Sequence, residues 1–215
     1  MLSSEGVPFA ASSACKQVSD RTRPTKRSGP RPVRAVNLLA RGEEWGGTMF
    51  ELKQISSDAV AAALKKAVRY RLLNEPMQAE SICIDVLMLE PDNREALVTL
   101  LLALTDQFDQ HLSERVRRTR EVLDRIDDDY SRLYYEGIVC ERQAKAHLRK
   151  GGPGSGHYTF ALLRKAMDLY EKAELLSPEG NDDAVLRWNA CARIIMGHPE
   201  VEPEPPTPRK PMTLE

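Results

Sequence analysis

The chain has 215 residues, of which 41% are hydrophobic and 29% are charged, and its formal net charge is −1 at pH 7. This balance argues against nucleic acid and against a membrane surface as partners, because both are bound through an excess of Lys and Arg. No stretch approaches the roughly 18 continuous apolar residues that a membrane-spanning helix needs.

The prolines divide the chain into three parts. Ten of the fourteen prolines precede residue 49 or follow residue 198. Segments rich in proline and poor in apolar residues bury too little surface to fold. We therefore expect a disordered or mis-assigned extension over 1–48, a helical domain over 50–197 and a disordered Pro-rich tail over 198–215. The middle part is long enough to form a core without disulfides.

Residues 1–48 carry eight Lys and Arg against four acids and show no helical or strand period. A basic, serine-containing start is compatible with an organelle transit peptide. A second interpretation fits better, because Gly46-Gly47-Thr48 is encoded by G-rich codons at about the position of a bacterial ribosome-binding site. We predict that translation starts at Met49.

Two helix pairs are expected next. The first pair begins with a cap at Ser56, Ser57 or Asp58, turns at 74–76 and returns over 77–89. The second pair covers 94–106 and a returning helix through 112–126. Apolar residues recur at helical spacing in the first helix (Val60, Leu64, Ala67, Val68 and Leu72).

A third pair and a single last helix follow. The third pair covers 130–150 and 158–176, and Asp127-Asp128-Asp129 precedes it, where negative charge complements the helix dipole. The glycine-rich segment 151–156 joins its two helices. The last helix, capped by Asp182 or Asp183, runs to Met196.

A recurrent spacing of small, aromatic and proline residues marks the ends of two pairs. It is clearest in Ala166, Tyr170, Ala173 and Pro178, and it recurs in Ala79, Cys83, Val86 and Pro91. Small residues allow two helices to approach closely, an aromatic ring fills the gap between them, and proline ends the helix. Gly137 occupies a further small-residue position.

This spacing resembles the tetratricopeptide repeat (TPR), and the resemblance covers roughly 57–196. The chain looks like the small bacterial TPR proteins, whose functions are mostly unassigned. The resemblance implies an all-α fold, a right-handed α-solenoid of about three TPR-like helix hairpins with a C-terminal capping helix.

No residue set supports catalysis, a cofactor or a metal. Segment 151–156 has the glycine separation of a phosphate loop but lacks the Lys, Ser or Thr and strand that such a loop needs. The four histidines show no metal-ligand spacing, and no serine lies in G-x-S-x-G. We therefore assign no catalytic, cofactor-binding or metal-binding residue and expect the protein not to be an enzyme.

The cysteines indicate a reducing compartment. Cys83, Cys140 and Cys191 lie on apolar helix faces, and none of these or Cys15 belongs to a C-x-x-C pair. Cysteine in such positions acts as a small buried hydrophobe. We therefore expect a cytoplasmic protein without disulfides.

The TPR resemblance implies a protein–protein interaction scaffold or adaptor whose first helices line a concave groove. Projected onto this sequence, the family's groove positions are Leu64, Val68, Arg71, Val98, Leu102, Thr105, Tyr134, Ile138, Glu141, Asn189 and Arg193. This set is apolar in the middle with Arg71 and Arg193 at its ends, and it favours a protein or peptide partner with apolar and acidic residues.

Three alternatives stay open. A secretion-type or assembly chaperone is built from a similar number of repeats. A ligand-binding protein would use the loop 151–156. A nucleic-acid binder would use Arg115, Arg117, Arg118 and Arg120, although the interleaved Glu114 and Glu121 are typical of a charged outer helix face.

Overall fold

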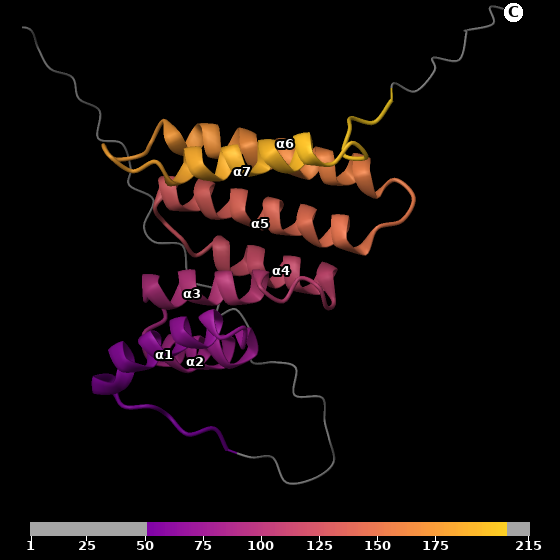
Figure 1. Cartoon of the computed structure of the whole chain (residues 1–215). Helices are drawn as coiled ribbons and strands as arrows, with labels where there is room; N and C mark the ends of the chain where they lie inside the picture. Colours follow the sequence, from indigo (N-terminus) through magenta and orange to yellow (C-terminus); the bar gives the residue numbers. More distant parts are fainter. Residues whose placement is uncertain (1–50, 206–215) are drawn as a thin grey trace, which may run out of the picture. The chain divides into compact units, whose positions relative to one another are not determined.

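Residues 51–205 are described by the computed structural model, and they belong to the unit Gly46–Glu215. The regular elements among these residues are all helical (Figure 1), which confirms the predicted all-α class. They are the 3₁₀ helix η1 (Ser57–Ala59) and the α-helices α1 (Val60–Leu72), α2 (Pro76–Leu89), α3 (Arg94–Thr105), α4 (Leu112–Leu123), α5 (Asp129–Lys150), α6 (Ser155–Glu174) and α7 (Asp183–Gly197).

Local signals account for where the helices begin. The Asn93 side chain accepts a hydrogen bond from the Ala96 N–H (2.9 Å) at the start of α3. Asp128 accepts from the Ser131 N–H (2.9 Å) at the start of α5, within the predicted acidic cap. Pro76 occupies the first turn of α2, where its missing N–H is not needed. Each of these caps satisfies or removes an N–H that the helix itself leaves unpaired.

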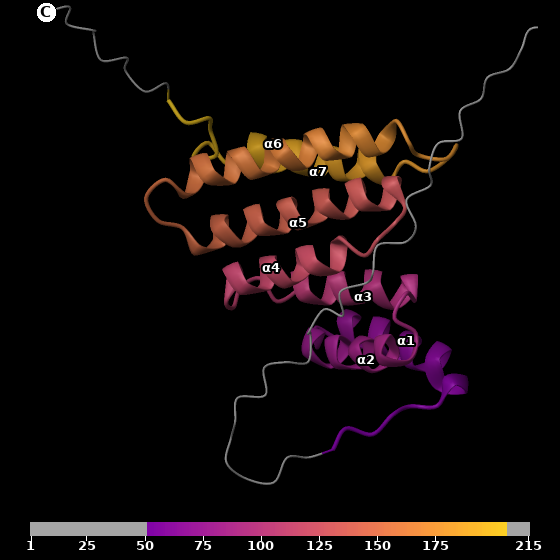
Figure 2. The same cartoon turned by 180° about the vertical axis from the view of Figure 1, so that it is seen from behind.

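Each helix packs against the next one in the chain, so the helices form the hairpins α1/α2, α3/α4 and α5/α6, with α7 against α6. The hairpins follow one another in chain order (Figures 1 and 2). Contacts of α1 with α3 and of α3 with α5 bring these first helices of the hairpins side by side. This row of helices carries the polar cavity described below.

The two helices of the α5/α6 hairpin approach closely at Gly137. The missing side chain of this residue leaves a gap on α5, which we call the notch. A Cβ atom at this glycine would lie 2.5 Å from Cε1 of Tyr170, and the Tyr170 side chain is fully buried. Ala166 and Ala173, one turn before and after the tyrosine on α6, are also fully buried. The close helix approach that the small–aromatic–small spacing predicted is therefore present at this hairpin.

The segment after α7 returns to the start of α6. Val201 is 3% exposed and packs with the apolar residues of α5, α6 and α7. A Cβ atom at Gly156 would lie 1.9 Å from the carbonyl oxygen of Glu200, so only glycine permits this approach. The carbonyl of Glu202 lies 3.0 Å from Nδ1 of His157. Val201 therefore anchors 198–205 to the helices. The predicted extension over 1–48 and the part of the predicted tail from 206 to 215 lie outside the described residues.

Gly137→Ala tests the notch. The added methyl group meets a buried aromatic ring, and forced overpacking of this kind costs about 1–3 kcal/mol. Gly197→Ala is the matched control, because nothing lies within 4 Å of a Cβ atom there. Denaturant unfolding should show a clear loss of stability for the first variant and none for the second; equal stabilities would contradict the packing.

The described cysteines should be unreactive in the folded protein. Cys83, Cys140 and Cys191 are free and buried, and burial raises the pKa of Cys83 and of Cys191 to about 12. Because the thiolate is the reactive form, a Cys15→Ser variant should not react with a thiol reagent in mildly alkaline buffer. The same variant should release three thiol equivalents after unfolding in guanidinium. Rapid reaction of the native protein would contradict this burial.

Candidate functional site

A polar cavity of about 440 Å³ opens on the side formed by α1, α3, α5 and α7. We call it the groove. Its lining combines basic, acidic and apolar side chains from these four helices and the segments that follow α1 and α3: Val68, Arg71, Leu72, Asn74, Thr105, Asp106, Asp109, Arg142, Lys145, Arg149 and Arg187. The groove is therefore a shared surface of several helices that are far apart in the sequence.

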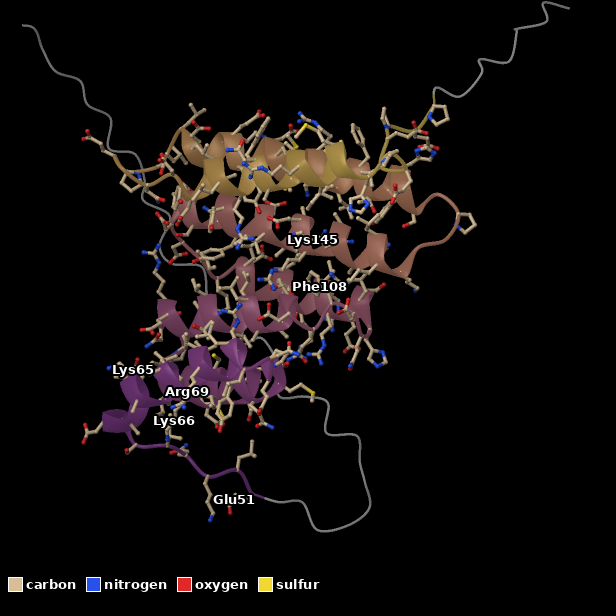
Figure 3. All side chains as sticks on the ribbon, viewed as in Figure 1. Glu51, Lys65, Lys66, Arg69, Phe108 and Lys145 are labelled. Atoms are coloured by element: carbon tan, nitrogen blue, oxygen red, sulfur yellow. The ribbon has the colours of Figure 1, made fainter. Side chains whose placement is uncertain are left out.

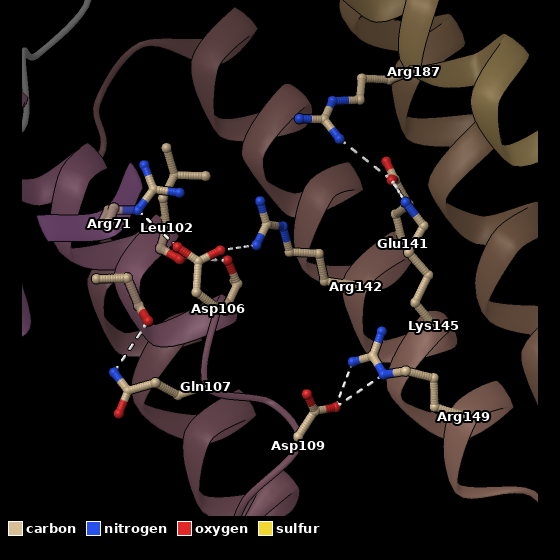
Figure 4. A network of polar contacts seen from close by, with 12 residues as sticks. Arg71, Leu102, Asp106, Gln107, Asp109, Glu141, Arg142, Lys145, Arg149 and Arg187 are labelled. Atoms are coloured by element: carbon tan, nitrogen blue, oxygen red, sulfur yellow. Dashed lines mark hydrogen bonds and ion pairs between the residues drawn. The ribbon is translucent and has the colours of Figure 1, made fainter. Parts of the chain in front are cut away.

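Asp106, at the end of α3, joins α1 to α5 (Figure 4). Its Oδ2 accepts a hydrogen bond from Nε of Arg71 (2.8 Å), and its Oδ1 pairs with Nη1 of Arg142. All three side chains are largely buried. One carboxylate thus lies between two guanidinium groups, and a single positive charge is left over at this point.

Glu141 holds a second pair of cations from within the fold. Its side chain is fully buried, and Oε1 accepts from Nζ of Lys145 (2.5 Å) and from Nη1 of Arg187 (3.3 Å). Its Oε2 accepts from the Tyr170 hydroxyl (2.8 Å). A buried carboxylate needs such partners to remain ionised. Here too one carboxylate serves two cations and leaves one positive charge in excess.

Tyr134 lies beside Arg187 in the same cluster of groups. Burial raises the pKa of Tyr134, against the opposing effect of a hydrogen bond with Arg187. The pKa of Arg187 is raised because the charge of Glu141 and the hydrogen bond to Tyr134 outweigh the effect of burial. The Tyr134 ring also contacts Tyr130, Tyr135 and Tyr170. Both groups are therefore in their usual protonation states at neutral pH, with the guanidinium charged and the phenol neutral.

A third ion pair at the edge of the groove is balanced. Nε of Arg149 donates to Oδ1 of Asp109 (3.1 Å), and both side chains are more than half exposed. Taken together, five cations face two lining carboxylates and the buried Glu141, which leaves an excess of two positive charges. On a chain with a net charge of −1, this is a local concentration of positive charge suited to an anionic ligand.

The structure brings together only part of the predicted groove set. Arg71 and Thr105 line the groove, Glu141 lies buried beneath it, and Tyr134 contacts Arg187. Asn189 and Arg193 are not among its lining residues. The α7 side chain that lines the groove is Arg187, two and six residues earlier.

Sequence reasoning missed the α5 cations. Arg142, Lys145 and Arg149 recur at intervals of three and four residues and therefore share one helix face. This spacing was the available signal. Arg142 pairs with Asp106, and Arg149 pairs with Asp109. Both acids come from another hairpin, and a single sequence does not reveal that pairing.

Two other basic regions differ from the groove. Arg115 and Arg118 of the predicted outer face bind Glu80 of α2 (2.8 and 2.5 Å), so they join α4 to α2. On α1, Lys65, Lys66 and Arg69 are exposed and lie away from Lys145 (Figure 3). They do not contribute to the groove lining.

Metal and membrane features were sought in the same part of the chain. Residues 51–205 contain no group of three or more His, Cys, Asp or Glu side chains placed to hold a metal ion. None of the described helices combines the length and apolarity needed to cross a membrane. In the loop 151–156, Gly151, Gly152 and Gly154 have positive φ angles, which explains why glycine is used there.

Comparison of the chain with protein-family models, curated proteins and solved structures finds no match.

Glu80→Gln tests the ion pairs between α2 and α4. Burial alone would raise the pKa of Glu80, but the hydrogen bond from Gln107 and the charges of Arg118 and Arg115 lower it below its ordinary value. A lowered pKa means that the carboxylate stabilises the fold above its ordinary pKa and that this stabilisation is lost as pH falls through the folded-state value. We expect the variant to lose about 2 kcal/mol at neutral pH.

The difference between wild type and Glu80→Gln should shrink as the pH is lowered toward and below the ordinary pKa of a glutamate. Glu121→Gln is the control, because Glu121 pairs with the exposed Arg117, and such a surface pair contributes only about 0–1 kcal/mol. Urea unfolding at several pH values measures both. A difference independent of pH would show that the Glu80 charge does not stabilise the fold.

Proposed function

We propose that residues 51–205 form an α-solenoid of TPR-like helix hairpins and that the protein is a non-catalytic interaction scaffold or adaptor. In this proposal a segment of a partner protein lies in the groove. The partner segment is acidic and carries apolar residues beside its acids.

The packing at the α5/α6 hairpin supports the repeat assignment. The Gly137–Tyr170 contact and the buried Ala166 and Ala173 are the features that the TPR spacing implies. In α2, Ala79, Cys83 and Val86 are fully buried, as the weaker copy of the pattern requires. The packing of each hairpin against the next one in the chain also supports this proposal.

The excess of positive charge in the groove is the observation that favours an acidic partner. Lys145 and Arg142 are 37% and 26% exposed, so both remain accessible while their carboxylate partners are fully or largely buried. Val68 and Leu72 add an exposed apolar border at the α1 end. Partly buried arginines of this kind are frequent binding hot spots. Arg115 and Arg118, the basic residues of the nucleic-acid alternative, share Glu80 and lie outside the groove.

Peptide selection tests the proposal. The full chain is used to select binding peptides from a random library displayed on phage, and the site is mapped by NMR shifts of the labelled protein. We expect the largest chemical-shift changes on peptide binding at Val68, Leu72 and Thr105. We expect Lys145→Glu to lower the affinity of the protein for the selected peptides about tenfold or more.

Lys172→Glu is the matched control, because Lys172 is an exposed lysine on α6 outside the groove. It makes the same charge change and should leave peptide affinity nearly unchanged. Shifts that concentrate on α4, or equal losses in both variants, would contradict binding in the groove.

A further inference from the structure

We infer that the groove recognises two carboxylate side chains, about 5–7 Å apart, within one partner segment. Each of them binds one of the two cation pairs that share a carboxylate of the protein. The inference rests on the proposed function and specifies the ligand of that same site. It follows from how the excess charge is distributed, not from the total charge of the groove.

The excess positive charge is localised at two points. Asp106 is shared by Arg71 and Arg142, and Glu141 is shared by Lys145 and Arg187. We call these the Asp106 site and the Glu141 site. Each site has two cations and one carboxylate, whereas the Arg149–Asp109 pair is balanced. A ligand that neutralises the groove therefore needs one negative charge at each site.

Both sites keep hydrogen-bond donors for a ligand. A guanidinium group has five N–H donors, and Arg71 uses only its Nε–H and Arg142 only one Nη1–H in these contacts. At the Glu141 site, Lys145 uses one of three donors. The oxygens of Asp106 and Glu141 are occupied by these cations and by Tyr170. The other donors of Arg71, Arg142 and Lys145 make no hydrogen bond to the described residues, and a carboxylate supplies two oxygens that accept such donors in a bidentate manner.

The spacing comes from α5. Arg142 of the Asp106 site and Lys145 of the Glu141 site are three residues apart on this helix, so their Cβ atoms are separated by about 5–6 Å. Two acids have a matching separation if they lie one turn apart on a helix (about 5–6 Å) or at alternate positions of an extended segment (about 7 Å).

The acids are expected inside the segment rather than at its last residue. Val68 and Leu72 line the α1 end of the groove, beyond Arg71. A segment that covers them must continue past the acid held at the Asp106 site. Side-chain carboxylates are therefore the source of both charges.

Defined peptides with blocked ends test the inference by fluorescence anisotropy with the full chain. One set of peptides carries two Glu residues two or four positions apart, and a second carries a single Glu. A third set carries two Glu residues eight positions apart, and a fourth carries Gln in place of each Glu. The closely paired peptides should bind about tenfold more tightly than the single-Glu peptide. The widely spaced pair should gain no more than about twofold, the statistical factor of two alternative acids.

Two neutralising variants assign each acid to its site without leaving a carboxylate unpaired. In Arg142→Gln, Asp106 keeps Arg71, and in Lys145→Gln, Glu141 keeps Arg187 and Tyr170. Each variant should reduce the affinity of the paired peptides about tenfold, to the level of the single-Glu peptide. The single-Glu peptide should lose only about twofold in either variant, because the other site remains. Lys172→Gln should change neither.

The inference is overturned if affinity follows the number of acids and not their spacing, or if the two variants affect single- and double-acid peptides equally. It is also overturned if only a peptide with a free C-terminal carboxylate binds. In each of these cases the proposed function stands if the peptides selected from the library still shift the NMR signals of Val68, Leu72 and Thr105. The proposed function fails separately if those peptides map elsewhere.

Discussion

The contact of Tyr170 with Gly137 and Glu141 connects the core of the fold to its groove. The tyrosine ring fills the space that the missing Gly137 side chain leaves between α5 and α6, and its hydroxyl donates to the fully buried Glu141. Glu141 in turn accepts hydrogen bonds from Lys145 and Arg187 at the surface. The helix spacing in the core therefore determines where two of the groove cations lie, and a residue that never reaches the surface positions the surface charge.

A carboxylate buried as completely as Glu141 is costly unless its oxygens are paired, and each of its oxygens has a partner here. The same reasoning applies to Asp106, whose two oxygens are paired with different helices. Because two cations share each acid, these contacts stabilise the helix arrangement without cancelling the positive charge of the groove. The same side chains thus form the structural ion pairs and the proposed binding surface. Glu80 is likewise shared by two cations, Arg115 and Arg118, but these join α2 to α4 and do not line the groove.

The sequence predicted the helices well because their signals are local. The predicted acidic cap at Asp128 and the apolar residues at helical spacing act within one or two turns. Asn93 and Pro76 act equally locally, at the N-cap of α3 and in the first turn of α2, although Pro76 was expected in the turn 74–76. Which side chains line the groove depends on the rotation of one helix against another, which a single sequence does not reveal. Arg187 of α7 is among the lining residues, whereas Arg193, which the TPR resemblance projects onto the groove, is not. The burial of Val201 in the segment after α7 had no periodic signal, since a single apolar residue among prolines and acids shows none.

The near-neutral composition of the chain conceals the local excess of positive charge in the groove. Net charge is a sum over the whole chain, whereas a bound segment experiences mainly the charges within about 8 Å, the screening length at physiological ionic strength. In the proposed binding mode, specificity follows from the geometry of the cations that share Asp106 and Glu141. Under that proposal these two shared acids bear more directly on the choice of partner than the total charge of −1 does.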